Sequence, residues 1–163
     1  MNLNAHHPLS LGFLTLILLI KSTSSFSTEM TQSTEKIKPK FMTNAVIEKL
    51  SLPFSEAVKV GHTLYLSGQL GADPKTGQLV SGGIVPETHQ TMKNIQATLT
   101  KNGLNFDNLI KCTVFINDIK QWPAFNQVYR GYFKNHFPAR SALGSNGLAL
   151  GAALEIECIA WLP

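Results

Sequence analysis

An arginine and a glutamate that could together bind a small anionic molecule stand near the end of the chain. Arg140 follows Pro138-Ala139, and Glu155 lies fifteen positions further on, inside an apolar run. Arginine presents a planar set of N–H donors that can bind a carboxylate through two hydrogen bonds. A glutamate in apolar surroundings can hold a water molecule or transfer a proton. The two side chains therefore indicate a pocket for a small molecule that carries a carboxylate.

The spacing alone leaves a second interpretation of this pair open. Glu155 and Glu157 stand two positions apart in a predicted strand, so both side chains should point to one face of a sheet. A carboxylate on a buried face requires a partner. Arg140 could be that partner either in a functional pocket or in a salt bridge across a subunit interface.

The sequence lacks the motifs of several other kinds of catalysis. Its histidines share no spacing typical of metal ligands. It contains no phosphate-binding Walker A loop, no dinucleotide-binding glycine motif and no nucleophile elbow. We therefore expect neither a metal nor an organic cofactor.

Hydrophobic periodicity predicts the elements that must position Arg140 and Glu155. In chain order these are strands at residues 57–60 and 63–70, a helix at 85–102, a strand at 109–116, a helix at 121–136 and a strand at 154–162. The Gly- and Ala-rich residues 141–151 are expected to form a loop. The order favours an α+β fold, a two-layer sandwich with both helices on one face of a sheet. Oligomerisation would then cover the other face.

The second predicted helix carries an aromatic stripe. Its apolar residues recur at helical spacing, at Phe125, Val128, Tyr129, Tyr132 and Phe133. A stripe of this kind is typical of a helix face that packs into a hydrophobic core rather than one that binds a cofactor. We therefore expect these side chains to be part of the core.

The chain of 163 residues has the length of one domain preceded by a leader. Residues 1–28 are predicted to be a signal or targeting segment, because Leu9–Ile20 is apolar, is too short to cross a bilayer, and is followed by small residues. The polar residues 29–42 are expected to be a flexible linker, and residues 43–163 the folded domain.

The leader predicts export to the periplasm or the medium. Residues 1–8 contain neither Lys nor Arg, although secretory signals usually begin with positive charge. Two alternatives therefore stay open. The segment could be an organelle presequence, or translation could start at Met30 or Met42 and give a cytoplasmic protein. No second long apolar run follows, so we expect no stable membrane insertion after processing. The net charge of +4 is mostly scattered and gives no support for a nucleic-acid partner.

Both cysteines, Cys112 and Cys158, lie in apolar runs with strand character. Free cysteine is often a small buried hydrophobic residue, and we expect two buried thiols. A disulfide is the alternative if the protein is exported to an oxidising compartment.

Five motifs, in the same order along the chain, resemble the RidA (YjgF) family of reactive-intermediate deaminases. The resemblance covers about residues 43–163. The motifs are Leu66–Gln69 (LSGQ), Lys111–Ile116 (KCTVFI), Phe125–Tyr129 (FNQVY), Phe137–Ser141 (FPARS) and Leu154–Ala160 (LEIECIA).

This resemblance implies a chorismate-mutase-like fold with a mixed β-sheet, assembled as a homotrimer with clefts between subunits. It also implies an activity. Members of the family hydrolyse 2-imino acids, such as 2-iminobutanoate and 2-iminopropanoate, to 2-keto acids and ammonia without a cofactor. The expected partner is therefore a small imino or keto acid.

The resemblance assigns roles to individual residues. Arg140 matches the arginine that binds the substrate carboxylate, and Glu155 matches the glutamate that helps to hold the attacking water, so these two would be the catalytic residues. The backbone of Ala142 would share that water. Ser67 and Gly68 match positions that line the cleft, and Asn126 matches a residue near it. The resemblance therefore predicts these substrate-binding residues: Arg140, Ser67, Gly68, Asn126 and Ala142.

Two positions differ from the best-known deaminase branch. Phe54, which we add to the substrate-binding residues, stands where that branch has a tyrosine, and Ala142 stands where many members have a cysteine. The lost hydroxyl changes the hydrogen bonding of the site.

Two alternative functions therefore stay open: a trimer that binds small carboxylates without turnover, and RNA cleavage, an activity attributed to some relatives. For the latter the sequence offers no aromatic stacking platform or dense basic stripe.

Overall fold

The structure, a computed structural model, describes residues 36–163. The predicted leader at residues 1–28 lies outside the described residues, as does the first half of the predicted linker, residues 29–35. The end of that linker, Lys40–Met42, is the strand β1 rather than flexible chain, and it pairs with the next strand of the sheet.

Within residues 36–163, six strands form one mixed sheet in the order β1-β2-β3-β6-β4-β5. Strands β4 and β5 are parallel, and every other neighbouring pair is antiparallel. The strands after β1 are β2 (Ala57–Val60), β3 (Thr63–Leu70), β4 (Leu109–Ile116), β5 (Ala139–Gly144) and β6 (Leu154–Trp161). The helices are α1 (Ala45–Lys49), α2 (Ile84–Lys101) and α3 (Trp122–Arg130), with short 3-10 turns at 106–108, 119–121 and 149–151.

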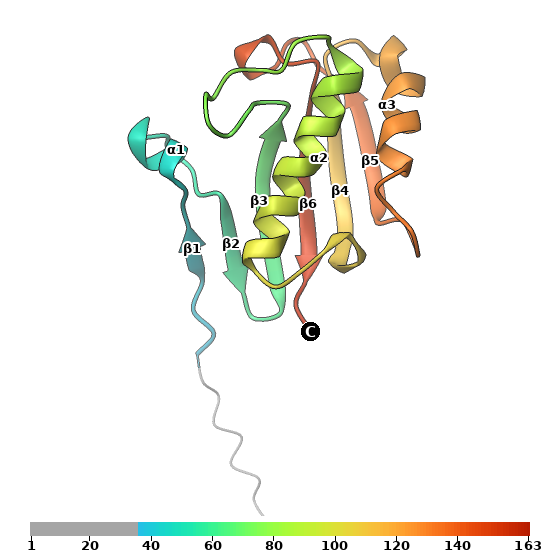
Figure 1. Cartoon of the computed structure of the whole chain (residues 1–163). Helices are drawn as coiled ribbons and strands as arrows, with labels where there is room; N and C mark the ends of the chain where they lie inside the picture. Colours follow the sequence, from blue (N-terminus) through green and yellow to red (C-terminus); the bar gives the residue numbers. More distant parts are fainter. Residues whose placement is uncertain (1–35) are drawn as a thin grey trace, which may run out of the picture. The chain divides into compact units, whose positions relative to one another are not determined.

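The two longer helices cover one face of the sheet (Figure 1). Met92, Ile95 and Leu99 of α2 and Phe125 of α3 are fully buried against the sheet. The inward residues of β3, β4 and β6 complete this core. The structure therefore confirms the predicted α+β two-layer sandwich, and the buried aromatic residues of α3 confirm that its stripe belongs to the core.

Strand β6 shows how the sequence pattern fixes the orientation of the side chains. Leu154, Ile156 and Cys158 are buried, whereas Glu155 is half-buried and Glu157 is exposed. Because side chains alternate along a strand, both glutamates point away from the helices. The prediction that they share one face is confirmed.

Two sequence-based boundaries are wrong. Helix α3 ends at Arg130, six residues before the predicted end, where Gly131 caps it through bonds to the Val128 and Tyr129 carbonyls. Helix periodicity overestimated its length because Phe133, beyond the helix, still packs into the core. Part of the predicted loop, residues 141–144, belongs to β5, an edge strand whose exposed residues give no apolar alternation.

Cys112 and Cys158 are joined by a disulfide, so the expectation of two free thiols is wrong. They stand directly opposite each other in β4 and β6, with Cα atoms 4.1 Å apart. The two residues are 46 positions apart in the sequence, so only the pairing of the strands brings them together.

None of the helices in residues 36–163 is long and apolar enough to cross a membrane.

Replacing both cysteines by alanine should lower the free energy of unfolding by about 2–4 kcal/mol, because the crosslink restricts the unfolded chain. Urea denaturation at a fixed protein concentration measures the change. Reductant should destabilise the wild-type protein to the same extent and should leave the double variant unaffected. The disulfide would be contradicted if the wild-type protein, denatured without exposure to reductant, showed two reactive thiols.

Candidate functional site

The predicted site residues form two groups in the folded chain. The first group gathers where β3 runs beside β6, and it contains Ser67, Gly68 and Glu155. The pairing of these strands slips between Leu66 and Gln69, so Ser67 and Gly68 lie in an irregularity of β3. Glu155 of β6 pairs with Leu70, just beyond it.

Gly68 makes room for the Glu155 side chain. A Cβ atom built at Gly68 would overlap Glu155 Oε1 and approach its Cδ within 2.7 Å. Any larger residue at this position would therefore displace the carboxylate group. Glycine is required here by the close approach of a side chain and not by its backbone angles.

The hydroxyl of Ser67 ties this group to the segment that precedes β2. Ser67 Oγ donates to the Ser55 carbonyl at 2.6 Å, and the Ser67 N–H donates to the Glu56 carbonyl at 3.1 Å. Phe54 is the neighbour of Ser55 and has an exposed fraction of 51%. The bonds of Ser67 thus hold the segment that carries Phe54 beside the strand irregularity.

Glu155 has an unusual electrostatic environment for a carboxyl group. Burial raises its pKa above the ordinary value, and the neighbouring charge of Glu157 raises it further. The start of β6 is held by Glu87 of α2, whose Oε2 accepts a hydrogen bond of 2.8 Å from the Ala153 N–H. Glu87 is buried, so this bond fixes the chain two residues before Glu155.

The second group lies at the other edge of the sheet, on β5 and α3. The Arg140 guanidinium carbon is 4.7 Å from the ring centroids of Trp122 and Tyr129 and 5.6 Å from that of Phe125. Ala142 follows two positions later in β5 and therefore shares the face of Arg140. Asn126 lies between these aromatic residues in α3.

The two groups lie on opposite faces of the sheet. Arg140 pairs with the buried Cys112 and points toward α3, whereas Glu155 points to the face that carries no helix. Within one subunit the sheet therefore separates Arg140 from the two glutamates. A single chain does not bring Arg140 and Glu155 into one pocket.

Sequence reasoning missed the contact between Arg140 and Trp122. The predicted aromatic stripe consists of core residues alone and omits Trp122. The available signal was the spacing of Trp122, Phe125 and Tyr129, three and four residues apart, which places all three rings on one helix face.

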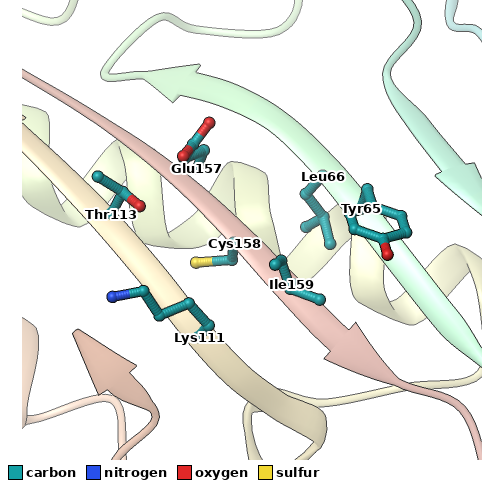
Figure 2. A pocket seen from close by; sticks show the side chains of 7 residues that line it. All are labelled: Tyr65, Leu66, Lys111, Thr113, Glu157, Cys158 and Ile159. Carbon is teal, nitrogen blue, oxygen red and sulfur yellow. The ribbon is translucent and has the colours of Figure 1, made fainter. Parts of the chain in front are cut away.

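Two of the hollows in the described part of the surface are lined by candidate residues, but neither of these two is lined by Arg140 or Glu155. One, of about 160 Å³, lies on the open face of the sheet and includes Tyr65, Lys111 and Glu157 (Figure 2). Lys111 Nζ also donates to Ser141 Oγ at 2.6 Å. The other, of about 340 Å³, runs along α3 and includes Trp122, Asn126 and Arg130.

Residues 36–163 contain no group of three or more His, Cys, Asp or Glu side chains arranged to hold a metal ion. The chemistry of the two groups is that of one carboxyl and one guanidinium. Together they suit the binding of a small anion and the transfer of protons through a carboxylate.

Comparison with known proteins covers almost the whole of the described domain. The family model Endoribonuclease L-PSP matches residues 46–162. The 2-iminobutanoate/2-iminopropanoate deaminase of Homo sapiens is 45% identical over 108 residues, which are 66% of this chain and 79% of the relative. The protein of the same name from Capra hircus is 48% identical over the same shares.

Solved structures agree with these relatives. A Rid family protein from Yersinia pestis is 36% identical, with a TM-score of 0.70 over 77% of this chain and 100% of that protein. RidA from an Antarctic Psychrobacter is 32% identical, with a TM-score of 0.67 over 77% of this chain and 98% of that protein. The chain therefore belongs to the RidA (YjgF) family.

Proposed function

We propose that this protein hydrolyses reactive 2-imino acids, such as 2-iminobutanoate and 2-iminopropanoate, to 2-keto acids and ammonia without a cofactor. The observation that carries the proposal is the half-buried Glu155 carboxyl over Gly68, with its raised pKa. Relatives named 2-iminobutanoate/2-iminopropanoate deaminase support it, at 45% and 48% identity.

The chemistry needs little beyond position and one proton carrier. Water adds to the imine carbon, and the C–N bond of the resulting amino alcohol then breaks to leave the keto acid and ammonia. In the proposed mechanism the Glu155 carboxylate takes a proton from the attacking water and delivers it to the imine nitrogen, which gives the amino alcohol. It then transfers the hydroxyl proton to the same nitrogen as the C–N bond breaks, so that the carbonyl forms and ammonia leaves. Arg140 binds the substrate carboxylate and orients the imine carbon toward the water.

We further propose that the active site forms between subunits of a homotrimer. Within one chain, Arg140 and Glu155 face opposite sides of the sheet. A cleft that uses both must therefore combine Ser67, Gly68 and Glu155 of one subunit with Arg140 of its neighbour. The water would be shared by Glu155 and the Ala142 backbone across the same contact.

The open face of the sheet supports such an assembly. Large apolar side chains lie on it without cover from a helix in the described residues. The exposed fractions are 47% for Tyr65, 45% for Leu143 and 51% for Trp161. Exposed large apolar side chains on a sheet face are typical of a face that another subunit covers.

Arg140→Ala and Glu155→Gln should each lower kcat/KM for imine hydrolysis by about 10- to 100-fold, since each removes a charged hydrogen-bonding group. Coexpression of the two variants should restore about a quarter of the wild-type activity. When the two kinds of subunit mix at random, about a quarter of the clefts receive an intact Glu155 from one subunit and an intact Arg140 from its neighbour. An amino-acid oxidase generates the imine, and semicarbazide traps what the protein has not hydrolysed.

Separately purified variants that are mixed without subunit exchange serve as the control and should show no recovery. Verified mixed trimers without recovered activity would mean that both groups belong to one subunit. Wild-type protein that does not accelerate imine hydrolysis above the spontaneous rate would instead favour a trimer that only binds carboxylates.

Gly68→Ala should lower kcat/KM as much as Glu155→Gln does, because the new methyl group displaces the Glu155 carboxyl. The fold should survive, since the overlapping atoms belong to the end of a flexible side chain. The double variant Gly68→Ala/Glu155→Gln should be no less active than Glu155→Gln alone. Additive losses in this cycle, at unchanged circular dichroism, would show that Gly68 acts by another route.

Activity should rise with pH through the pKa of Glu155, because only its carboxylate accepts a proton from water. Glu157→Gln removes one of the two causes that raise this pKa, so the acid limb of the profile of kcat/KM against pH should move to lower pH. The exposed Glu48 of α1 gives a matched control, and Glu48→Gln should leave the limb in place. A limb that stays or moves to higher pH in Glu157→Gln would exclude Glu155 as the titrating base.

A further inference from the structure

Three aromatic rings of one helix hold the Arg140 guanidinium. Trp122, Phe125 and Tyr129 of α3 all lie within 6 Å of its carbon atom, at 4.7, 5.6 and 4.7 Å. Such distances are those of cation–π contacts, in which the negative face of a ring attracts the cation. We call these three residues the aromatic cradle.

The cradle holds the cation and leaves its hydrogen-bond donors available. In residues 36–163 the Arg140 side chain makes no ion pair and no hydrogen bond. A guanidinium carries five N–H donors. A carboxylate accepts hydrogen bonds from these donors, whereas the face of an aromatic ring attracts the charge and leaves the donors at the edge of the guanidinium available. The contacts therefore restrict the orientation of Arg140 while its planar edge stays free for an anion.

Tyr129 takes part through its ring and not through its oxygen. Its hydroxyl is buried and has no hydrogen-bond partner among the described residues. Burial raises the pKa of Tyr129 to about 12, although the charge of Arg140 opposes this effect. The side chain is therefore neutral at physiological pH, and no phenolate neutralises the guanidinium.

Trp122 connects the cradle to the surface. It contacts Arg140 and also lines the 340 Å³ hollow along α3, together with Asn126. Its indole is half-buried, in contrast to the fully buried Phe125. Trp122 packs on Phe125 from the edge of the core, so its replacement should disturb the core less than replacement of Phe125 would, and we choose it for the test.

We propose that Trp122 and Tyr129 are positioning residues that orient the Arg140 guanidinium for a substrate carboxylate and so set the affinity for it. The identity of the substrate as an imino acid rests on the proposed function, but the cradle itself requires only an anionic carboxylate ligand. On this view the rings contribute to ligand binding more than to the chemical step. The alternative is that they only pack against the stem of the arginine.

Calorimetric titration of the full-length protein with 2-oxobutanoate, the keto-acid product, tests the proposal. Trp122→Leu should raise its Kd about three- to tenfold, because leucine keeps an apolar contact but offers no π face. Trp122→Phe should restore most of the affinity. In the hydrolysis assay Trp122→Leu should raise KM by a similar factor and change kcat little.

Tyr129→Phe separates the ring from the hydroxyl. It should raise Kd less than Trp122→Leu does, because the ring is the contacting group and the oxygen has no partner. Phe106→Leu is the matched control for loss of an aromatic ring, since Phe106 packs on Tyr132 and Phe133 and has no contact with Arg140. It should lower the thermal midpoint without raising Kd.

An unchanged Kd in Trp122→Leu, or an increase in Phe106→Leu as large as in Trp122→Leu, would overturn the proposal. So would wild-type protein that binds no 2-oxobutanoate, or that binds it as well after Arg140→Ala. Failure of the proposed function gives a different result: the wild-type protein would bind the keto acid, with Trp122→Leu weaker, yet would not hydrolyse the imine.

Discussion

The alternation of side chains along β6 is the constraint on which the other features depend. This strand lies between β3 and β4, so both of its edges are paired and its register is fixed twice. Leu154, Ile156 and Cys158 then enter the core, and Glu155 must face away from it. A shift of one residue would bury the carboxylates and expose the core residues, which the hydrophobic effect forbids.

The same rule, applied to β5, separates the two charged groups. Arg140 pairs with the inward-facing Cys112 and is therefore directed to α3, where the aromatic cradle receives it. A guanidinium on the helix side and a carboxyl on the open side cannot meet in one protomer. Their separation is the physical reason why a site that needs both must be completed by a second subunit.

Sequence reasoning predicted most of the regular elements because each has a strong period of its own, as at 63–70 and 109–116. It failed at β5, whose residues are mostly exposed, and at the end of α3, where Phe133 continues the apolar pattern beyond the helix. It identified Arg140 and Glu155 through family motifs, but not that they face apart. Neither the Cys112–Cys158 bond nor the contact of Glu155 with Gly68 has a local signal, because both arise from strand pairing.

The disulfide connects these two halves of the site within the sheet. Cys112 stands opposite Arg140 in the β4–β5 pair, and Cys158 lies three residues after Glu155 in β6. The crosslink therefore joins the strand of the carboxylate to the neighbour of the strand that carries the arginine. In a trimer this link would hold the strands of each subunit rigid, so that Glu155 and Arg140 would each enter their separate clefts from a fixed framework. A cleft that relies on orientation more than on reactive groups gains most from such rigidity.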